Sequence, residues 1–226
     1  MTDAVDFHDE TIDHFLQQYK SDPDFSERLR VWTGLLGPFV NPGVSAVDLG
    51  CGSGVLTLWA AARGASVLGV DGSAAMVEAA RSAAAGTVGA RFLRMELPGG
   101  VAGAPFDLVF ASSLLEYLDD SGDVDRWLAS LVKPGGTLAV SLPNRQSLYR
   151  RCESVRFGLT GSPAYLNHVR RRSTVGETAE RFSQHGLLLT QFRMFAHRPA
   201  LSRLARAWLP ARFSENLFAV VFRKPF

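Results

Sequence analysis

The sequence predicts an α/β fold, with a mostly parallel β-sheet and helices on both of its faces. Short apolar runs typical of strands alternate with longer helical patterns between residues 45 and 142, and helical connections are what neighbouring parallel strands require. The chain has 226 residues, with no internal repeat and no low-complexity linker. This length suits one domain with its own hydrophobic core.

Two helices are predicted ahead of the sheet. Ile12, Phe15, Leu16 and Tyr19 recur at helical spacing within residues 9–20. The segment 21–24 contains a proline and breaks this pattern, so a second helix is expected to start at Asp24 or Ser26 and to run to Leu36.

The rest of the chain alternates between strand and helix signals. Thr174 and Glu177 have the spacing of a capping box, which predicts a helix to about His185 that Gly186 stops. The predicted strands cover 45–49, 66–70, 91–95, 106–111, 137–142, 187–195 and 217–222, and the remaining helices cover 55–63, 74–84, 124–132 and 200–209.

A glycine-rich turn follows the first strand. Gly50, Gly52 and Gly54 alternate with other residues, and Asp71 ends the second strand. Glycines let a ligand approach bare backbone, and an acid at the second strand can accept both hydroxyls of a ribose, so the pair predicts an adenosine site. A dinucleotide loop would need glycine at position 55, where the sequence has Val.

The pattern D-x-G-x-G-x-G, led by Asp48, resembles the first motif of class I S-adenosylmethionine-dependent methyltransferases. Three segments, 71–81, 106–111 and 133–138, are similar to later motifs of that family and follow in the same order. The resemblance implies a Rossmann-like methyltransferase fold with seven strands, closed by an antiparallel hairpin of strands six and seven. It also implies S-adenosylmethionine (SAM) as methyl donor, S-adenosylhomocysteine (SAH) as product, and no metal.

The resemblance implies roles for individual residues. The three glycines would approach the cofactor, Asp48 would orient the loop and the amino group, and Asp71 would bind the ribose. Met95 and Glu96 would take the adenine, and Ser112 would lie beside the methionine portion. The full expected cofactor set is Asp48, Gly50, Cys51, Gly52, Gly54, Asp71, Gly72, Met76, Met95, Glu96 and Ser112.

Residues 112–118 resemble a segment that ends in L-E-H in ubiquinone-pathway O-methyltransferases. Tyr117 stands where that family has His, and a tyrosine with an ordinary pKa near 10 is a poor base at neutral pH. Either the acceptor ionises readily or another residue removes its proton. Packing or capping is the expected role of Glu116. Tyr117, His168 and Tyr19 are the candidate catalytic residues, and His8 or His14 could also face the substrate.

The segment after the fifth strand is predicted to cover the acceptor. Residues 145–172 carry seven arginines against one acid, Glu153, with aromatic residues between them. Arginine forks and aromatic walls suit a ring that bears an acid, whereas a solvated amphipathic helix explains the same pattern. The expected acceptor-contacting residues are Tyr19, Tyr117, Asn144, Tyr149, Tyr165, Asn167 and His168.

Charge is divided unevenly along the chain. Residues 1–142 carry 9 basic and 18 acidic side chains, whereas residues 143–226 carry 15 and 4. The basic half makes RNA methylation the alternative to methylation of a small molecule, although residues 112–114 lack the motif typical of base methylation. An oxygen acceptor is expected first, as a carboxylate, phenol or hydroxyl, with nitrogen and carbon left open.

The remaining expectations concern organisation and location. Cys51 and Cys152 have neither metal nor disulfide spacing, and neither a signal peptide nor a membrane span is predicted. A cytoplasmic monomer or homodimer is therefore expected. The predicted single domain comprises a helical cap (1–40), a cofactor-binding core (41–142), a lid (143–175) and a C-terminal helix with strands (176–226).

Overall fold

The computed structural model describes residues 23–196 and 207–226. The predicted helix over 9–20, with His8, His14 and Tyr19, lies outside the described residues, as does most of the predicted helix over 200–209. The described strands are β1 (Ser45–Leu49), β2 (Ser66–Asp71), β3 (Ala90–Arg94), β4 (Phe106–Ala111), β5 (Val132–Pro143), β6 (Leu188–Phe195) and β7 (Leu217–Arg223). The described helices are α3 (Pro23–Leu36), α4 (Val55–Ala61), α5 (Ala74–Ala83), α6 (Gly122–Ser130), α7 (Leu148–Thr160), α8 (Val175–Ser183) and α10 (Ala211–Ser214), with 3₁₀ turns η1 (Gly37–Phe39), η2 (Leu115–Tyr117) and η3 (Ala164–Asn167).

The strands form one sheet in the order β3-β2-β1-β4-β5-β7-β6. The first five strands run parallel to one another, and β7 pairs antiparallel with both β5 and β6. This confirms the predicted α/β class and the C-terminal antiparallel hairpin. Strand order reverses beside β1, between β2 and β4, which is where a sheet of this kind leaves a crevice for a ligand.

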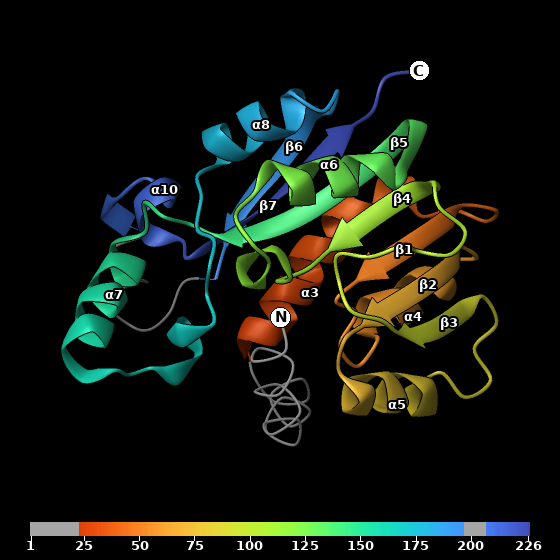
Figure 1. Ribbon diagram of the computed structural model, residues 1–226, viewed down its shortest axis with the longest axis horizontal. Helices are drawn as coiled ribbons and strands as arrows, with labels where there is room; N and C mark the ends of the chain where they lie inside the picture. The colour runs from red at the N-terminus through yellow and green to blue at the C-terminus, as the bar shows by residue number, and fades with distance from the viewer. Residues whose placement is uncertain (1–22, 197–206) are drawn as a thin grey trace.

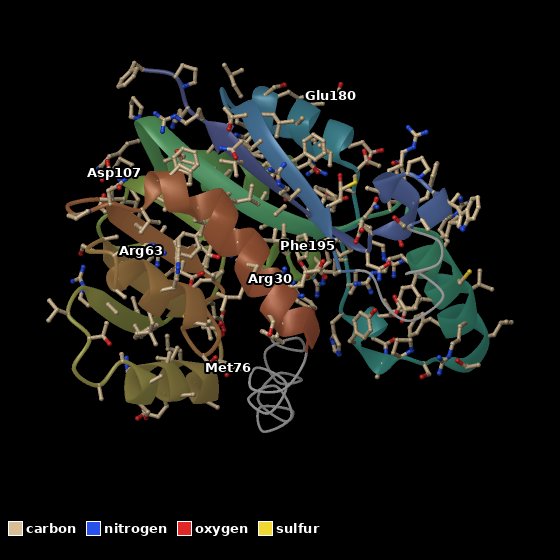
Figure 2. All side chains as sticks on the ribbon, turned by 180° about the vertical axis from the view of Figure 1, so that it is seen from behind. Arg30, Arg63, Met76, Asp107, Glu180 and Phe195 are labelled. Atoms are coloured by element: carbon tan, nitrogen blue, oxygen red, sulfur yellow. The ribbon has the colours of Figure 1, made fainter. Side chains whose placement is uncertain are left out.

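Helices cover both faces of the sheet (Figure 1). On one face, Leu128 of α6 and Phe182 of α8 are buried against side chains such as Val109 and Val220. On the opposite face, α3 and α4 contribute Trp32, Leu36 and Ala60 to a second core. Figure 2 shows α3 lying across that face of the sheet. The two cores hold β1 and β4 rigidly, so the loops after these strands start from fixed positions.

Beyond the carboxyl end of β5 lies the segment predicted as a lid (Figure 1). It forms α7 and η3, and α7 has no buried residue. This helix contacts α10 and lies outside both cores.

Two boundaries show how tertiary context acts on local sequence. Thr174 and Glu177 make both hydrogen bonds of the predicted capping box at the start of α8. The predicted start of the fifth strand at residue 137 is wrong, because Val132 already pairs with Phe106 of β4. Gly135 also donates its N–H to the Lys224 carbonyl oxygen at 2.8 Å, so the chain beyond β7 holds the apparent turn in the sheet.

Within residues 23–196 and 207–226, no helix has both the length and the apolar character needed to cross a membrane.

Candidate functional site

The glycine loop after β1 is fixed by the strand beside it. The backbone N–H groups of Gly50 and Cys51 both donate to the Val70 carbonyl oxygen, at 2.8 and 3.0 Å. Gly54 begins α4 with a φ of +81°, and a Cβ there would come within 2.7 Å of the Phe92 ring. Only glycine fits this position, because the left-handed backbone and the aromatic ring both exclude a side chain.

Asp71 links this loop to the next one. Its Oδ2 accepts from the Gly52 N–H at 2.8 Å, and its Oδ1 accepts from the Ser73 N–H at 2.9 Å. Ser73 in turn caps α5 through the Met76 N–H. Each carboxylate oxygen can accept more than one hydrogen bond, so the group can hold both loops and still bind a diol. The Asp71 carbonyl oxygen also accepts from the Met95 N–H at 2.9 Å, which draws the end of β3 to the same place.

A pocket opens between this loop and α3. Asp48, Gly50, Cys51 and Ser112 line it from the carboxyl ends of β1 and β4, and α3 closes it from above with apolar side chains and Arg28. The complete lining is Phe25, Arg28, Leu29, Trp32, Asp48, Gly50, Cys51, Val55, Leu56 and Ser112. The site is thus polar along the strand ends and mostly apolar along the helix.

Asp48 is a buried acid on the floor of this pocket. Its Oδ2 accepts from the Thr57 hydroxyl at 2.7 Å. Burial raises the pKa of Asp48 to about 7, and the nearby Asp71 adds to the rise. A ligand ammonium group at this position would favour the ionised form of Asp48. Burial also raises the pKa of the Cys51 thiol, so this side chain stays neutral and serves as a small wall of the pocket.

A second group of polar side chains gathers around η2, just beyond Ser112. Glu116 is only 5% exposed, and its Oε2 has no hydrogen-bond partner among the residues that the structure describes. Burial raises the pKa of Glu116 to about 7, against the opposing effects of Arg28, Arg150 and the Ser113 hydroxyl. Burial and the neighbouring Glu116 raise the pKa of Tyr117 above its ordinary value. Tyr117 therefore stays protonated at neutral pH and can donate a hydrogen bond, but it is a poor base.

The lid contributes Arg150 and Tyr165 to the same region. Arg150 donates to Glu153 Oε2 at 2.8 Å and to the Tyr165 hydroxyl. Tyr149 acts on Tyr165 electrostatically, and Tyr165 acts on Tyr117. The structure thus brings together three tyrosines predicted from the sequence, with Arg150 and Glu116 between α7, η3 and η2.

Several predicted site residues lie elsewhere or are already engaged. Asn144 is fully buried, and its side-chain amide donates to the carbonyl oxygens of Arg212 and Glu215 at 2.8 Å each. It therefore holds α10 against the end of β5, and both N–H groups of this amide are already engaged. Asn167 and Glu96 are exposed, His168 is half-buried within the lid, and Met76 is buried in α5. The Gly72 carbonyl oxygen accepts from Arg94. Tyr19 is outside the described residues.

The site residues predicted from the sequence did not include two residues near the pocket, Arg28 and Glu116. Arg28 was hidden in an ordinary helical pattern, and packing was the role expected for Glu116. The available signal for Glu116 was its position within an apolar run, 114–118, directly after a strand end that faces the site. In the part of the chain that the structure describes, no three His, Cys, Asp or Glu side chains are grouped so as to hold a metal ion.

Comparison with known proteins finds similarity to one protein family and to one fold. Residues 47–138 match the sequence model of the methyltransferase domain family. The chain is 35% identical over 133 residues to a trans-aconitate 2-methyltransferase of Azoarcus sp. (strain BH72), covering 56% of this chain and 49% of that protein. It is 29% identical over 193 residues to a ubiquinone biosynthesis O-methyltransferase of Leptothrix cholodnii, covering 80% and 78%.

Among solved structures, a magnesium protoporphyrin IX methyltransferase from Synechocystis PCC 6803 with bound SAH superposes with a TM-score of 0.74. The match covers 99% of both chains at 19% identity, which shows the shared fold alone. The chain spans about half the length of several curated relatives that it matches, including the Azoarcus protein. The part that matches the family model, residues 47–138, contains the glycine loop, Asp71 and the turn before Leu138.

Proposed function

We propose that the chain is a class I S-adenosylmethionine-dependent methyltransferase, the family that it resembles in residues 47–138, and that it transfers the methyl group of SAM to an oxygen atom of a small molecule. The observation that carries the proposal is that an acid and the glycine loop line one pocket, and that a second acid is hydrogen-bonded to the same loop. Asp71 holds the Gly52 N–H, while Asp48 and Gly50 line the pocket under α3. This set offers carboxylates for an ammonium group and a diol, with an apolar wall between them.

The residues present fit SAM in charge and in polarity. Asp48 would face the α-amino group, Asp71 would accept from the ribose hydroxyls, and Met95 with Glu96 would border the adenine. Leu29 and Trp32 supply an apolar wall that suits a cofactor whose sulfonium is flanked by methylene groups. SAM, when bound, supplies a methyl group that is activated by the positive sulfur.

The chain's own contribution is orientation and exclusion of water. Holding the acceptor in line with the donor can supply several kcal/mol of the barrier reduction. α3 covers the pocket on one side, and Tyr117, Tyr149 and Tyr165 border the region next to it. His168 lies on the lid, and its backbone N–H donates to the Tyr165 carbonyl oxygen at 3.1 Å. Methylation of a nitrogen or carbon atom of a small molecule remains the alternative, because one fold serves all three kinds of acceptor.

Methyl-labelled SAM, mixed with the purified protein and an extract of the source cells, tests the proposal. The extract is then separated into small-molecule, RNA and protein fractions, with Asp71→Ala as the control protein. Label in the small-molecule fraction that disappears with the control is the expected result. Label in RNA or protein, or no label in any fraction, would overturn the proposal.

A further inference from the structure

Glu116 is a buried carboxyl group with one oxygen left over. Its backbone is fixed, because its carbonyl oxygen accepts from the N–H groups of Arg170 and Arg171 at 2.7 and 3.3 Å. The Ser113 hydroxyl hydrogen-bonds to its side chain, and Ser113 itself has a left-handed φ of +58°. Oε2 has no partner in the described structure although the side chain is 95% buried. An orphaned buried acceptor is costly, so its persistence suggests a partner that arrives with a ligand.

The surroundings of Glu116 point to the acceptor side of the pocket. Arg28 lines the pocket from α3 and is near enough to act on Glu116. Arg150 acts on it from α7, and the Arg150 Nε is also buried, with no hydrogen-bond partner in the described part of the chain. Tyr117 lies beside it on η2, and Tyr165 of η3 faces Tyr117 and Arg150. Within residues 23–196 and 207–226, the charged and titratable groups that act on Glu116 or lie beside it thus come from α3, α7, η2 and η3.

We propose that Glu116 Oε2 accepts the proton of a hydroxyl group, and that the acceptor of this enzyme is therefore an alcohol or a phenol. This inference rests on the proposed methyl transfer and names the substrate class of the same site. The ordinary role expected for Glu116, packing or helix capping, accounts for the Ser113 contact but leaves Oε2 unexplained.

The proton and electron pairs balance in one displacement. The O–H bond of the acceptor breaks, and its proton passes to Glu116 Oε2. The oxygen lone pair forms the new bond to the methyl carbon while the bond between that carbon and sulfur breaks, and its electron pair stays on sulfur as a neutral thioether. Glu116 later returns the proton to solvent, so no oxidant, reductant or further reactant is needed.

The other acceptor classes make poor use of this carboxyl group. A carboxylate has no proton to give at neutral pH, and an ionised Glu116 would repel it. An uncharged amine attacks through its lone pair, so no proton has to be removed before the transfer. A hydroxyl group gains most from a base whose pKa lies near the working pH, and burial sets the pKa of Glu116 in that range.

The chemistry of the labelled product tests the acceptor class before the compound is identified. The label that wild-type protein transfers from SAM to the small-molecule fraction is treated first with alkali and then with hot hydriodic acid. A methyl ether survives alkali and releases volatile methyl iodide in the acid, which is the expected result. Release as methanol in alkali, from an ester, or resistance to both treatments would overturn the hydroxyl assignment while leaving methyl transfer intact. An absence of label would instead reject the proposed function.

The Glu116→Gln variant tests the residue. It keeps the shape of the side chain, so we expect SAH affinity within about twofold of wild type and transfer slowed at least about 100-fold. Infrared difference spectra of the ligand-free protein provide a readout that does not depend on turnover. The spectra are recorded in an Asp48→Asn background, because Asp48 also has a pKa of about 7. In that background, a protonated-carboxyl band that titrates near pH 7 should be missing in Glu116→Gln and present in Glu153→Gln, in which the substituted carboxylate already accepts from Arg150.

These outcomes separate a proton acceptor from a structural residue. Transfer by folded Glu116→Gln at the wild-type rate, or an infrared band that persists in this variant, would overturn the role of Glu116. Slower transfer with weakened SAH binding would also count against it, because a proton acceptor acts on the acceptor and not on the cofactor.

Discussion

A single carboxylate can organise two loops and a ligand when each of its oxygens accepts more than one hydrogen bond. Asp71 is placed to do so, because its two oxygens each accept one N–H, from Gly52 and from Ser73. These two hydrogen bonds fix the orientation of the Asp71 carboxylate. If Asp71 binds the ribose as proposed, the protein would set the position of the ribose before the cofactor binds.

The Asp71→Ala variant should bind SAM more than about tenfold more weakly, because two charge-assisted hydrogen bonds to the ribose are lost. Calorimetric titration with SAH gives the same comparison without turnover. Asp107→Asn is a suitable control, since Asp107 bonds to Ser45 and Lys133 at the amino end of β1 and should leave the affinity unchanged. An unchanged dissociation constant in Asp71→Ala would contradict the ribose role.

Asp48 gives a pH-dependent prediction. Its pKa is about 7 in the folded protein and 3.8 ordinarily, so the folded state holds more protons than the unfolded state between these values. The stabilisation from the protonated group is therefore complete below about pH 3.8 and is lost as pH rises through 7. The difference between the two pKa values corresponds to about 4 kcal/mol in the free energy of unfolding.

Asp48→Asn cannot ionise, so the ligand-free variant should gain stability relative to wild type as pH rises from 4 to 8. Urea unfolding of both proteins across this range measures the difference in the free energy of unfolding. A difference that stays constant with pH would show that the carboxyl group titrates normally.

The residues that were predictable from sequence are those whose chemistry lies in the local backbone. The glycines and Asp71 act within one strand–turn–helix unit, so their order and spacing reveal them. The ionisation of Glu116 is influenced by Arg28 of α3 and Arg150 of α7, which are far from it in sequence. No local pattern shows that three such segments meet, so packing was a reasonable expectation for a glutamate in an apolar run.

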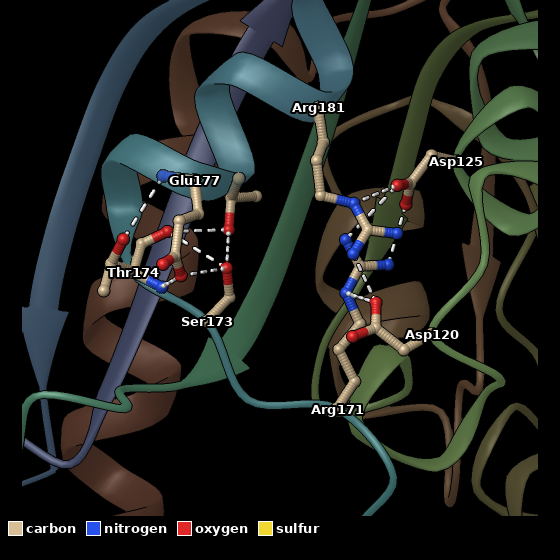
Figure 3. Close-up of polar contacts among 8 residues, drawn as sticks. Asp120, Asp125, Arg171, Ser173, Thr174, Glu177 and Arg181 are labelled. Atoms are coloured by element: carbon tan, nitrogen blue, oxygen red, sulfur yellow. Dashed lines mark hydrogen bonds and ion pairs between the residues drawn. The ribbon is translucent and has the colours of Figure 1, made fainter.

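At the scale of elements, one buried ion-pair cluster joins the lid to the core. Asp125 of α6 accepts from Arg171 at the end of the lid and from Arg181 of α8, at 2.7 Å each. Asp125 and Arg171 are both only 1% exposed, and Asp120 contacts both arginines (Figure 3). The same stretch of backbone that donates to Glu116 is therefore tied down through the Arg171 side chain.

The Asp125→Asn variant should lose about 3–5 kcal/mol of stability, because it leaves the charge of Arg171 buried and poorly compensated. Asp123→Asn on the same helix removes only an exposed pair with Arg126 and should cost at most about 1 kcal/mol. Urea unfolding of the two variants side by side makes the comparison. Equal losses would mean that the buried cluster is no more important than a surface pair.

The element boundaries followed from sequence wherever the signal was local, as in β4 and in the capping box of α8. β5 was predicted too short because its first residues look like a turn and become a strand only by pairing with β4 and with the chain after β7. The meeting of lid and core at Asp125 could not be foreseen, since three separate segments supply its charges.

Ion pairs between the two halves of the chain balance part of the uneven charge of the molecule. Among the arginines of residues 145–172, four form ion pairs, and their partners include Asp119, Asp120 and Asp125 from the acidic half of the chain. Arg172 donates to Ser154, while Arg151 and Arg156 form no ion pair with the part of the chain that the structure describes. Part of the charge asymmetry that motivated RNA as an alternative acceptor is thus neutralised by ion pairs within the described residues.

We therefore expect no strong binding of the full chain to single-stranded RNA. Binding measured by fluorescence anisotropy should fall within the non-specific range, about 10⁻⁴ to 10⁻⁶ M at physiological salt. The double variant Arg151→Gln/Arg156→Gln should shift this affinity only slightly, and Arg170→Gln, which breaks the pair with Asp119, serves as a comparison in which one paired charge is lost. Nanomolar affinity with a steep salt dependence would mean that the paired arginines exchange their internal partners for phosphates. In that case the lid would be a nucleic-acid surface, and RNA would replace the small molecule as the substrate to test.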